Sequence, residues 1–177
     1  MLRFVLEIAV EAPPTFVTDW WLDYGEQDAK LTPDMERRTV ERLDGLRTHL
    51  VTDLRFGKRR VRVDGVVIRE SELRWSIDGE MAVNGRPFAR EQVAFSVVPR
   101  GTGSTLQAGF QFRGKGAWSS LALALVGRSI RKGREEAYLT YAREMAEEFR
   151  KKAPSAAPTG ESAPSARRSS ALDRPSA

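Results

Sequence analysis

The sequence predicts an α+β domain in which an antiparallel sheet packs against a long C-terminal helix. Residues 2–12 and six later runs alternate apolar and polar side chains, which is the period of a half-buried strand. Residues 117–152 contain no proline, and their apolar side chains recur at spacings of three and four, as in an amphipathic helix. Such a helix needs a broad apolar surface to cover, and one face of the sheet can supply it.

A short helix follows the first strand. Pro13 and Pro14 end that strand, and a proline is tolerated in the first turn of a helix, so we expect a helix over residues 15–24. Gly25 is a natural C-terminal stop. Residues 27–34 are too short and too mixed to assign, and a second short helix is one reading of them.

The six central runs are expected to form a meander of antiparallel strands, because only short turns separate them. They cover residues 36–44, 47–56, 59–69, 72–83, 87–98 and 104–113. Asp44-Gly45 and Asn84-Gly85 lie at two of the breaks, and both dipeptides favour the type I′ hairpin turn, whose two central residues have positive φ. The run 36–44 is nearly all polar, which places it at an edge or rim of the sheet.

The alternation also predicts which side chains face the helix. The apolar parity of the last three runs comprises Leu73, Trp75, Ile77, Val93, Phe95, Val97, Leu106, Ala108, Phe110 and Phe112. The opposite parity is polar or small, so the sheet has one apolar and one wet face.

The C-terminal helix is either one element or two. Its second half places Tyr138, Tyr141 and Met145 on one face. A single helix over 117–152 would be about 54 Å long, and the alternative is two helices that meet near Gly127 or Gly133.

The domain is expected to span residues 1–152. Residues 153–177 consist mostly of Ala, Pro and Ser. Such a segment cannot bury enough apolar surface to offset the entropy of ordering it, so we expect a disordered tail.

The composition excludes several classes of site. The chain has no cysteine and a single histidine, so disulfides, thiolate zinc sites and multi-histidine metal sites are excluded, and no metal or cofactor is predicted. The net charge is +5, and most of the basic residues are interleaved with Asp and Glu along the strands. The N-terminus lacks the pattern of a signal peptide, and the longest apolar run, 121–126, is far shorter than the ~20 residues of a membrane span. We therefore expect a cytoplasmic protein.

The order of elements carries a resemblance to a known superfamily. It comprises the strand 2–12, the aromatic helix that includes Trp20 and Trp21, the six-strand meander with Phe110-Gln111-Phe112, and the helix ending in 138–149. This order resembles the helix-grip fold of the START-like (SRPBCC) superfamily, which includes polyketide cyclase/dehydrase and lipid-transport proteins. The resemblance covers residues 2–152 and implies a seven-stranded curved sheet wrapped around the final helix.

The resemblance also implies an internal cavity for an apolar or amphipathic small molecule or lipid, which the protein would bind or transport. The aromatic side chains could line that cavity or fill a core, and the resemblance favours a cavity. The predicted ligand-binding residues are Trp20, Thr52, Trp75, Phe95, Ala108, Phe110, Phe112, Tyr138 and Tyr141. Some members of the superfamily are cyclases or dehydratases, so an enzyme on the same scaffold is the alternative.

Candidate catalytic groups are few. His49 is the only imidazole, and its parity in the strand 47–56 points it at solvent or a neighbouring strand. Asp19 and Asp23 lie four residues apart on one helix face, where exposed carboxylates are common. No catalytic residue is assigned, and a binding protein is favoured over an enzyme.

Residues 118–134 suggest a membrane-peripheral module as a further alternative. An apolar run precedes the cations Arg128, Arg131, Lys132 and Arg134, which suits an anionic membrane surface. The first three are the predicted membrane contacts. The competing interpretation is a buried first half of the helix followed by a solvated basic turn. Nucleic acid is disfavoured because no stacking motif or reading helix accompanies the cations, and the oligomeric state is not predicted.

Overall fold

The computed structural model describes residues 1–24 and 34–152. Its elements are β1 (Leu2–Val10), α1 (Pro14–Leu22), β2 (Met35–Arg42), β3 (Arg47–Phe56), β4 (Arg59–Ser71), β5 (Arg74–Val83), β6 (Arg86–Arg100), β7 (Gly103–Gly114) and α3 (Ala117–Lys152). The order of strands and helices is the predicted one. The predictions for residues 27–33 and for the tail 153–177 lie outside the described residues.

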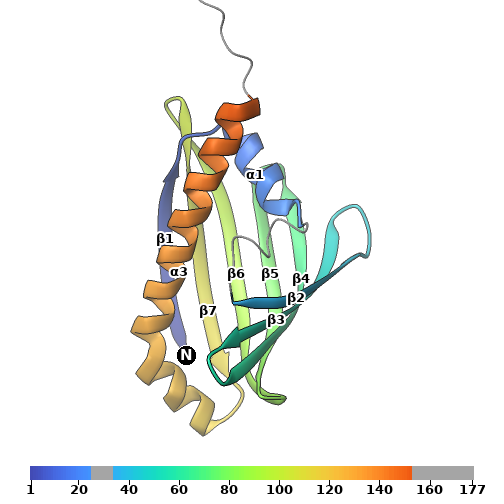
Figure 1. The fold of residues 1–177 in the computed structure, drawn as a ribbon, viewed down its shortest axis with the longest axis vertical. Helices are drawn as coiled ribbons and strands as arrows, with labels where there is room; N and C mark the ends of the chain where they lie inside the picture. The colour runs from blue at the N-terminus through green and yellow to red at the C-terminus, as the bar shows by residue number, and fades with distance from the viewer. Residues whose placement is uncertain (25–33, 153–177) are drawn as a thin grey trace, which may run out of the picture.

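The seven strands form one antiparallel sheet in the order β1-β7-β6-β5-β4-β3-β2. Consecutive strands from β2 to β7 are neighbours, and β1 completes the sheet beside β7. Figure 1 shows α3 running along β1 and β7, while β2 and β3 curve around at the other side. The predicted α+β helix-grip fold, with a curved sheet around the C-terminal helix, is confirmed.

Two hairpin turns were predicted to share one geometry, and the structure separates them. Asn84 and Gly85 both have positive φ, 49° and 77°, as a type I′ turn requires. Gly45 does not have positive φ, so the prediction for its turn is wrong. There the Asp44 carboxylate accepts hydrogen bonds from the backbone N–H groups of Leu46 and Arg47, at 2.9 and 2.8 Å. A side chain thus closes this turn in place of a left-handed backbone.

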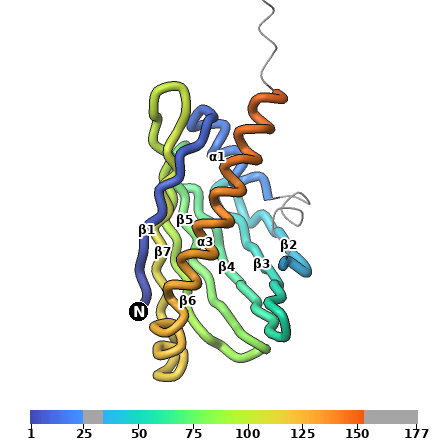
Figure 2. The backbone as a smooth tube through the Cα atoms, turned by 60° about the vertical axis from the view of Figure 1, so that its left-hand side comes forward, coloured from blue at the N-terminus to red at the C-terminus, as the bar shows by residue number. Residues whose placement is uncertain are grey.

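The C-terminal helix is one continuous element, and it packs on β1 and β7. Gly127 lies where the helix meets Leu2 of β1, and a Cβ atom there would be only 2.9 Å from a Leu2 methyl carbon. The missing side chain therefore lets the helix lie close to the first strand. Figure 2 shows the consequence, since α3 follows the β1–β7 side of the sheet and leaves β2 and β3 apart from it.

A pair of glycines lies on the inner face of the sheet between β4 and β5. Gly65 of β4 pairs with Gly79 of β5. A Cβ atom on Gly65 would lie 3.0 Å from the Cα of its partner and 3.1 Å from the Asp78 carbonyl oxygen. The strands therefore approach more closely than side chains would allow, and the inner surface at this point carries no side chain.

No helix within residues 1–24 and 34–152 is both long and apolar enough to cross a membrane.

Candidate functional site: a cavity between the sheet and the C-terminal helix

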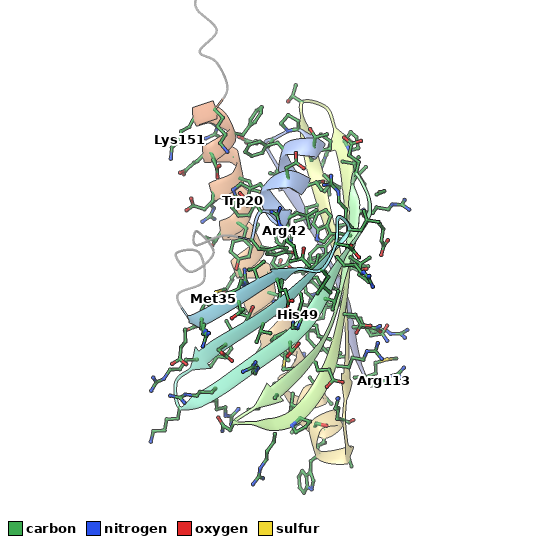
Figure 3. All side chains as sticks on the ribbon, turned by 90° about the vertical axis from the view of Figure 1, so that its right-hand side faces the viewer. Trp20, Met35, Arg42, His49, Arg113 and Lys151 are labelled. Carbon is green, nitrogen blue, oxygen red and sulfur yellow. The ribbon has the colours of Figure 1, made fainter. Side chains whose placement is uncertain are left out.

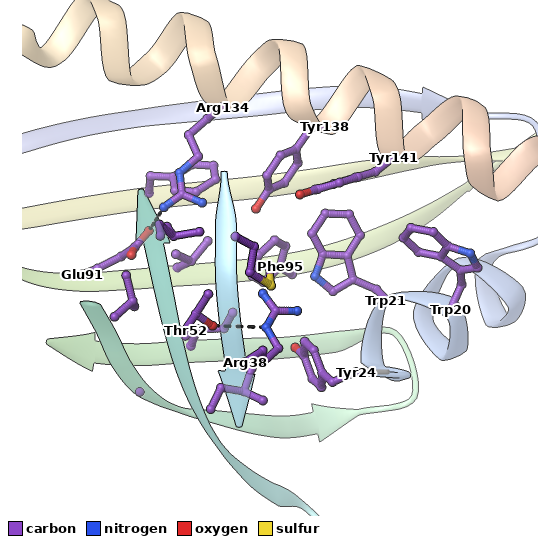
Figure 4. A pocket seen from close by; sticks show the side chains of 18 residues that line it. Trp20, Trp21, Tyr24, Arg38, Thr52, Glu91, Phe95, Arg134, Tyr138 and Tyr141 are labelled. Atoms are coloured by element: carbon purple, nitrogen blue, oxygen red, sulfur yellow. Dashed lines mark hydrogen bonds and ion pairs between the residues drawn. The ribbon is translucent and has the colours of Figure 1, made fainter. Parts of the chain in front are cut away.

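A cavity of about 180 Å³ lies between the inner face of the sheet, α1 and α3. Figure 4 shows the side chains that line it. They are Trp20, Trp21, Tyr24, Met35, Arg38, Leu50, Thr52, Leu54, Val63, Gly65, Ile77, Glu91, Val93, Phe95, Phe110, Arg134, Tyr138 and Tyr141. All the elements except β1 contribute, so the wall is assembled from the whole length of the domain.

Trp21 is the centre of an aromatic wall. Its ring centroid lies 4.9 Å from that of Tyr138, 5.5 Å from Phe95 and 5.6 Å from Tyr141. These rings come from α1, β6 and α3, and the angles between their planes are tilted or edge-on, as aromatic clusters prefer. Trp20 fixes the position of α1, because its indole N–H donates a hydrogen bond of 2.7 Å to the Glu148 carboxylate on α3.

An ion pair between a buried carboxylate and a half-buried guanidinium lies in the opposite part of the wall. The Glu91 carboxylate on β6 is 4% exposed, and it accepts a 2.8 Å hydrogen bond from the guanidinium of Arg134 on α3. The guanidinium also lies over the ring of Phe110, at 5.7 Å. Attraction by Glu91 raises the pKa of Arg134, so its guanidinium stays charged at neutral pH.

Arg38 brings a second cation into the wall from the edge strand β2. It pairs in register with Thr52 of β3, and its Nε donates a 3.1 Å hydrogen bond to the Thr52 hydroxyl. Its guanidinium lies 5.8 Å from the Tyr24 ring. A bulge between Met35 and Arg37 explains the orientation, because an extra residue in a strand turns the next side chain to the other face.

Tyr138 supplies a neutral hydroxyl that points into the cavity (Figure 4). Burial raises its pKa well above the ordinary range of a tyrosine. The group therefore stays protonated at any physiological pH and can donate a hydrogen bond to a ligand.

Six of the nine predicted ligand residues line the cavity. These are Trp20, Thr52, Phe95, Phe110, Tyr138 and Tyr141. The structure places the other three, Trp75, Ala108 and Phe112, in the filled core and not on the cavity wall. The reason is that parity assigns a side chain to the inner face but does not say whether a helix already covers it. Trp75 stacks on Phe95 at 5.0 Å, and its buried indole N–H has no partner among the described residues.

The charged groups of the wall were not predicted. Glu91 shares the apolar parity of β6 with Val93 and Phe95. A carboxylate on the inward parity could have indicated a charged group in the wall. Arg134 was grouped with solvated cations, although it precedes the inward Tyr138 by one helical turn. The inward position of Arg38 could not be predicted from the sequence. The strand around it is otherwise polar, and its sequence does not reveal the bulge.

The candidate catalytic groups do not come together. His49 lies on the outer face of the sheet, where its Nε2 is 2.8 Å from the Asp64 carboxylate and its Nδ1 is 3.7 Å from Glu41 (Figure 3). Asp19 and Asp23 are exposed on α1 and the turn after it. Within the described residues, no group of three or more His, Cys, Asp or Glu side chains could hold a metal ion.

The first turns of α3 expose their apolar side chains. Trp118 is 84% exposed, Leu125 76% and Leu121 51%. The interpretation of 118–134 as a buried first half of the helix is therefore wrong for these three residues, because α3 begins where the sheet ends. Arg128, Arg131 and Lys132 are exposed as well.

Comparison with known proteins places this architecture in a family. The family model for polyketide cyclase / dehydrase and lipid transport matches residues 1–140. None of the curated proteins matches the sequence.

Several solved structures share the fold. The protein TTHA0849 from Thermus thermophilus is 16% identical, with a TM-score of 0.64 over 86% of this chain and 99% of that one. A START superfamily protein from Mycobacterium smegmatis is 14% identical, with a TM-score of 0.61 over 82% and 99%. The di-domain ARO/CYC StfQ from the steffimycin biosynthetic pathway is 12% identical, with a TM-score of 0.67 over 85% of this chain, which spans about half (52%) of StfQ. These likenesses agree with the match over residues 1–140, and the chain belongs to the polyketide cyclase / dehydrase and lipid transport family.

Proposed function

We propose that the protein binds an apolar or amphipathic small molecule in the cavity between the sheet and α3. The observation that carries this proposal is the composition of the wall, in which an aromatic cluster around Trp21 faces polar groups from β2, β3 and β6. Small-molecule sites commonly combine a mostly apolar lining with a few convergent polar groups. Transport of the bound molecule would use the same cavity.

The size of the cavity supports a small ligand. A cavity of about 150 Å³ lined by apolar side chains accommodates benzene. The volume of about 180 Å³ here is therefore sufficient for a compact ring compound without rearrangement of the wall.

Native mass spectrometry of freshly purified protein tests the proposal. We expect a reproducible mass excess that is lost on denaturation. Val63→Phe should abolish the excess, because Val63 lines the cavity. Val5→Phe is the matched control, since Val5 is exposed on the outer face of β1 and the excess should persist. Wild-type protein that carries no excess and binds no ring compound would contradict the proposal.

A cyclase- or dehydratase-type enzyme is the second candidate. The favouring observation is that the hydroxyl of Tyr138 and the guanidinium of Arg38 reach one cavity, where they could polarise a carbonyl group. Incubation with a poly-β-ketone thioester and mass analysis of the products tests it. Wild-type protein should redirect the products and Tyr138→Phe should not; identical products with both would remove this candidate.

A membrane-peripheral role is the third candidate, alongside a cytoplasmic location. Exposed Trp118 and Leu125 precede Arg128, Arg131 and Lys132 on the same helix, so apolar insertion and attraction to anionic lipid could act together. Co-sedimentation with vesicles containing anionic lipid should exceed that with zwitterionic vesicles. Reversal of the three cationic charges should abolish the difference, and binding that ignores the reversal would remove this candidate.

A further inference from the structure

We infer that one end of the domain docks on an anionic lipid bilayer, with Phe56 and Trp118 as apolar anchors and cations from two hairpin turns beside them. This inference rests on the membrane-peripheral candidate of the proposed function and deepens it. It adds a set of contacts from the sheet, and it directs the end of the domain toward the bilayer instead of the side of α3.

Three segments that are far apart in the sequence meet at this end. Val61 of β4 pairs with Val83 of β5, so the β3–β4 turn lies beside the β5–β6 turn. Ala89 of β6 pairs with Gly114, the last residue of β7, and α3 begins shortly after it at Ala117. Figure 1 and Figure 2 both show the two turns and the start of α3 at the lower end of the molecule. We call this surface the basal end, and it comprises residues 56–60, 84–87 and 113–121.

The basal end holds the exposed aromatic side chains. Within residues 1–24 and 34–152, the aromatic side chains that are exposed are Phe56, at 50%, and Trp118, at 84%. Leu121, one turn further along α3, is 51% exposed. Aromatic side chains are favoured where lipid headgroups meet acyl chains, and aliphatic side chains insert there with them. A leucine offers no ring for stacking on a nucleobase, so this set fits lipid better than single-stranded nucleic acid.

The basal end also has uncompensated positive charge. Its exposed cations without an ion-pair partner among the described residues are Lys58, Arg59, Arg86 and Arg113. Carboxylates of the adjoining strands are already occupied, because Glu36 pairs with Arg55 and Glu80 pairs with Lys115. Surface cations are attracted to the negative potential of a bilayer that contains anionic lipid. Charge and apolar exposure therefore favour the same partner at the same surface.

Co-sedimentation with vesicles tests the charge of the basal end. The vesicles consist of phosphatidylcholine alone, or of phosphatidylcholine and phosphatidylserine in equal parts. Because each cation near the bilayer adds to the attraction, we expect wild-type protein to partition at least about tenfold more strongly onto the anionic vesicles. The basal variant should lose this preference, and it carries Lys58→Glu, Arg59→Glu and Arg86→Glu.

A second triple variant is the matched control. It carries Arg74→Glu, Arg100→Glu and Arg143→Glu, which produce the same change in net charge at exposed positions away from the basal end. Arg74 begins β5 and Arg100 ends β6, so both lie at the other end of the strands. This variant should keep the preference of the wild type. Far-UV circular dichroism verifies that both triple variants are folded.

Quenching of tryptophan fluorescence by brominated lipid in the anionic vesicles tests the two anchors without any change of charge. Of the four tryptophans, all within the described residues, Trp118 alone is exposed. We expect quenching in wild-type protein and its loss in Trp118→Phe. Phe56→Trp, introduced into Trp118→Phe, should restore quenching, because it places an indole at the β3–β4 turn. Absence of quenching at position 56 would overturn docking through the basal end.

The outcomes separate this inference from the candidate on which it rests. Vesicle binding that ignores the basal variant but is lost on reversal of Arg128, Arg131 and Lys132 would overturn the inference and leave the candidate standing. Equal losses in the basal and control variants would overturn the inference, because net charge alone would then explain binding. Wild-type protein that does not bind anionic vesicles would overturn both.

Nucleic acid is the remaining partner for an aromatic and cationic surface. Binding of wild-type protein to a single-stranded RNA oligonucleotide, without binding to the vesicles, would overturn the inference in favour of that partner. Native mass spectrometry decides the small-molecule proposal independently, because the mass excess does not require a membrane.

Discussion

The two halves of the sheet have the same alternating pattern but different interiors. In the half formed by β1, β7, β6 and β5, the inward side chains of Trp75, Leu106 and Phe112 are completely or almost completely buried in a filled core. Other inward side chains of this half, such as Ile77 and Val93, reach the near wall of the cavity. In the half formed by β4, β3 and β2, the inward side chains of Thr52 and Val63 face the cavity. Alternation along a strand therefore defines an inner face, but what covers that face decides whether it becomes core or ligand site.

The difference follows from the width of one helix. Seven strands spaced about 4.8 Å apart span roughly 29 Å, whereas a helix with its side chains is about 10–12 Å across. Because α3 packs on β1 and β7, and α1 on β6 and β7, neither of the two described helices makes its main sheet contacts with the far strands. Curvature of the sheet brings them around the remaining space, and the cavity is that space.

The largest effect is expected from truncation in the filled half. Phe112→Ala should lower the free energy of unfolding by about 3–5 kcal/mol, because it leaves a hole in a region that cannot collapse. Urea denaturation followed by circular dichroism measures the change. Val5→Ala, on the exposed face of β1, is the control and should stay within about 0.5 kcal/mol of wild type. A loss below about 1 kcal/mol for Phe112→Ala would contradict the description of this half as filled.

The next largest effect is expected at the boundary between the halves, where Glu91 meets Arg134. Glu91→Gln should cost about 1–3 kcal/mol, because it leaves a guanidinium in the wall without its carboxylate. The double variant with Arg134→Met should recover part of that loss. Glu80→Gln removes an exposed pair with Lys115 and should cost less than about 1 kcal/mol. Equal losses of unfolding free energy for Glu91→Gln and Glu80→Gln in urea denaturation would show that burial of Glu91 does not increase the stabilisation by its ion pair.

A smaller effect on stability is expected from enlargement in the hollow half. Val63→Phe places extra atoms in the cavity and should change the free energy of unfolding by less than about 1 kcal/mol. Ala108→Trp enlarges a residue in the filled half, where we expect a loss of about 1–3 kcal/mol or more from overpacking. Thermal unfolding of the two variants compares the halves directly. A greater loss for Val63→Phe would mean that the cavity is not available space.

The fold could be predicted from the sequence because its signals are local. Period-two alternation identified the strands, and Asn84-Gly85 identified a type I′ turn that the backbone angles confirm. The turn at Asp44 could not be predicted in detail, because the same Asp-Gly dipeptide also allows closure by the carboxylate. The exposure of Trp118 was not predicted either, since it depends on where the sheet ends beneath α3.

The candidate site was harder to predict from the sequence, because the positions of its polar groups depend on pairing between distant segments. The aromatic wall was anticipated from Tyr138, which lies on the apolar face of the helix, and from Phe95, which lies on the apolar parity of its strand. The pair of Glu91 with Arg134 joins residues 43 positions apart, and no local pattern reports such a contact. Arg38 turns inward because of a bulge, which is a property of two strands in register and not of one.

The smallest effect is expected on the outer surface of the hollow half, where His49 joins β3 to β4. The hydrogen bond to Asp64 raises the pKa of His49 above its ordinary value of 6.5. The folded protein therefore holds this proton more tightly than the unfolded chain, and the resulting stability is fully present below about pH 6.5 and lost as the pH rises through the raised pKa. Asp64→Asn should thus cost more stability at about pH 5.5 than at about pH 8.5.

The total loss in Asp64→Asn should stay under about 1 kcal/mol, because the two side chains are 32% and 50% exposed. Urea denaturation at the two pH values measures it. Glu72→Gln, an exposed carboxylate in the turn after β4, should show no such dependence. A loss that grew with pH would mean that His49 is neutral in the folded protein. The contact between His49 and Asp64 would then add nothing to the pairing of β3 with β4 at neutral pH.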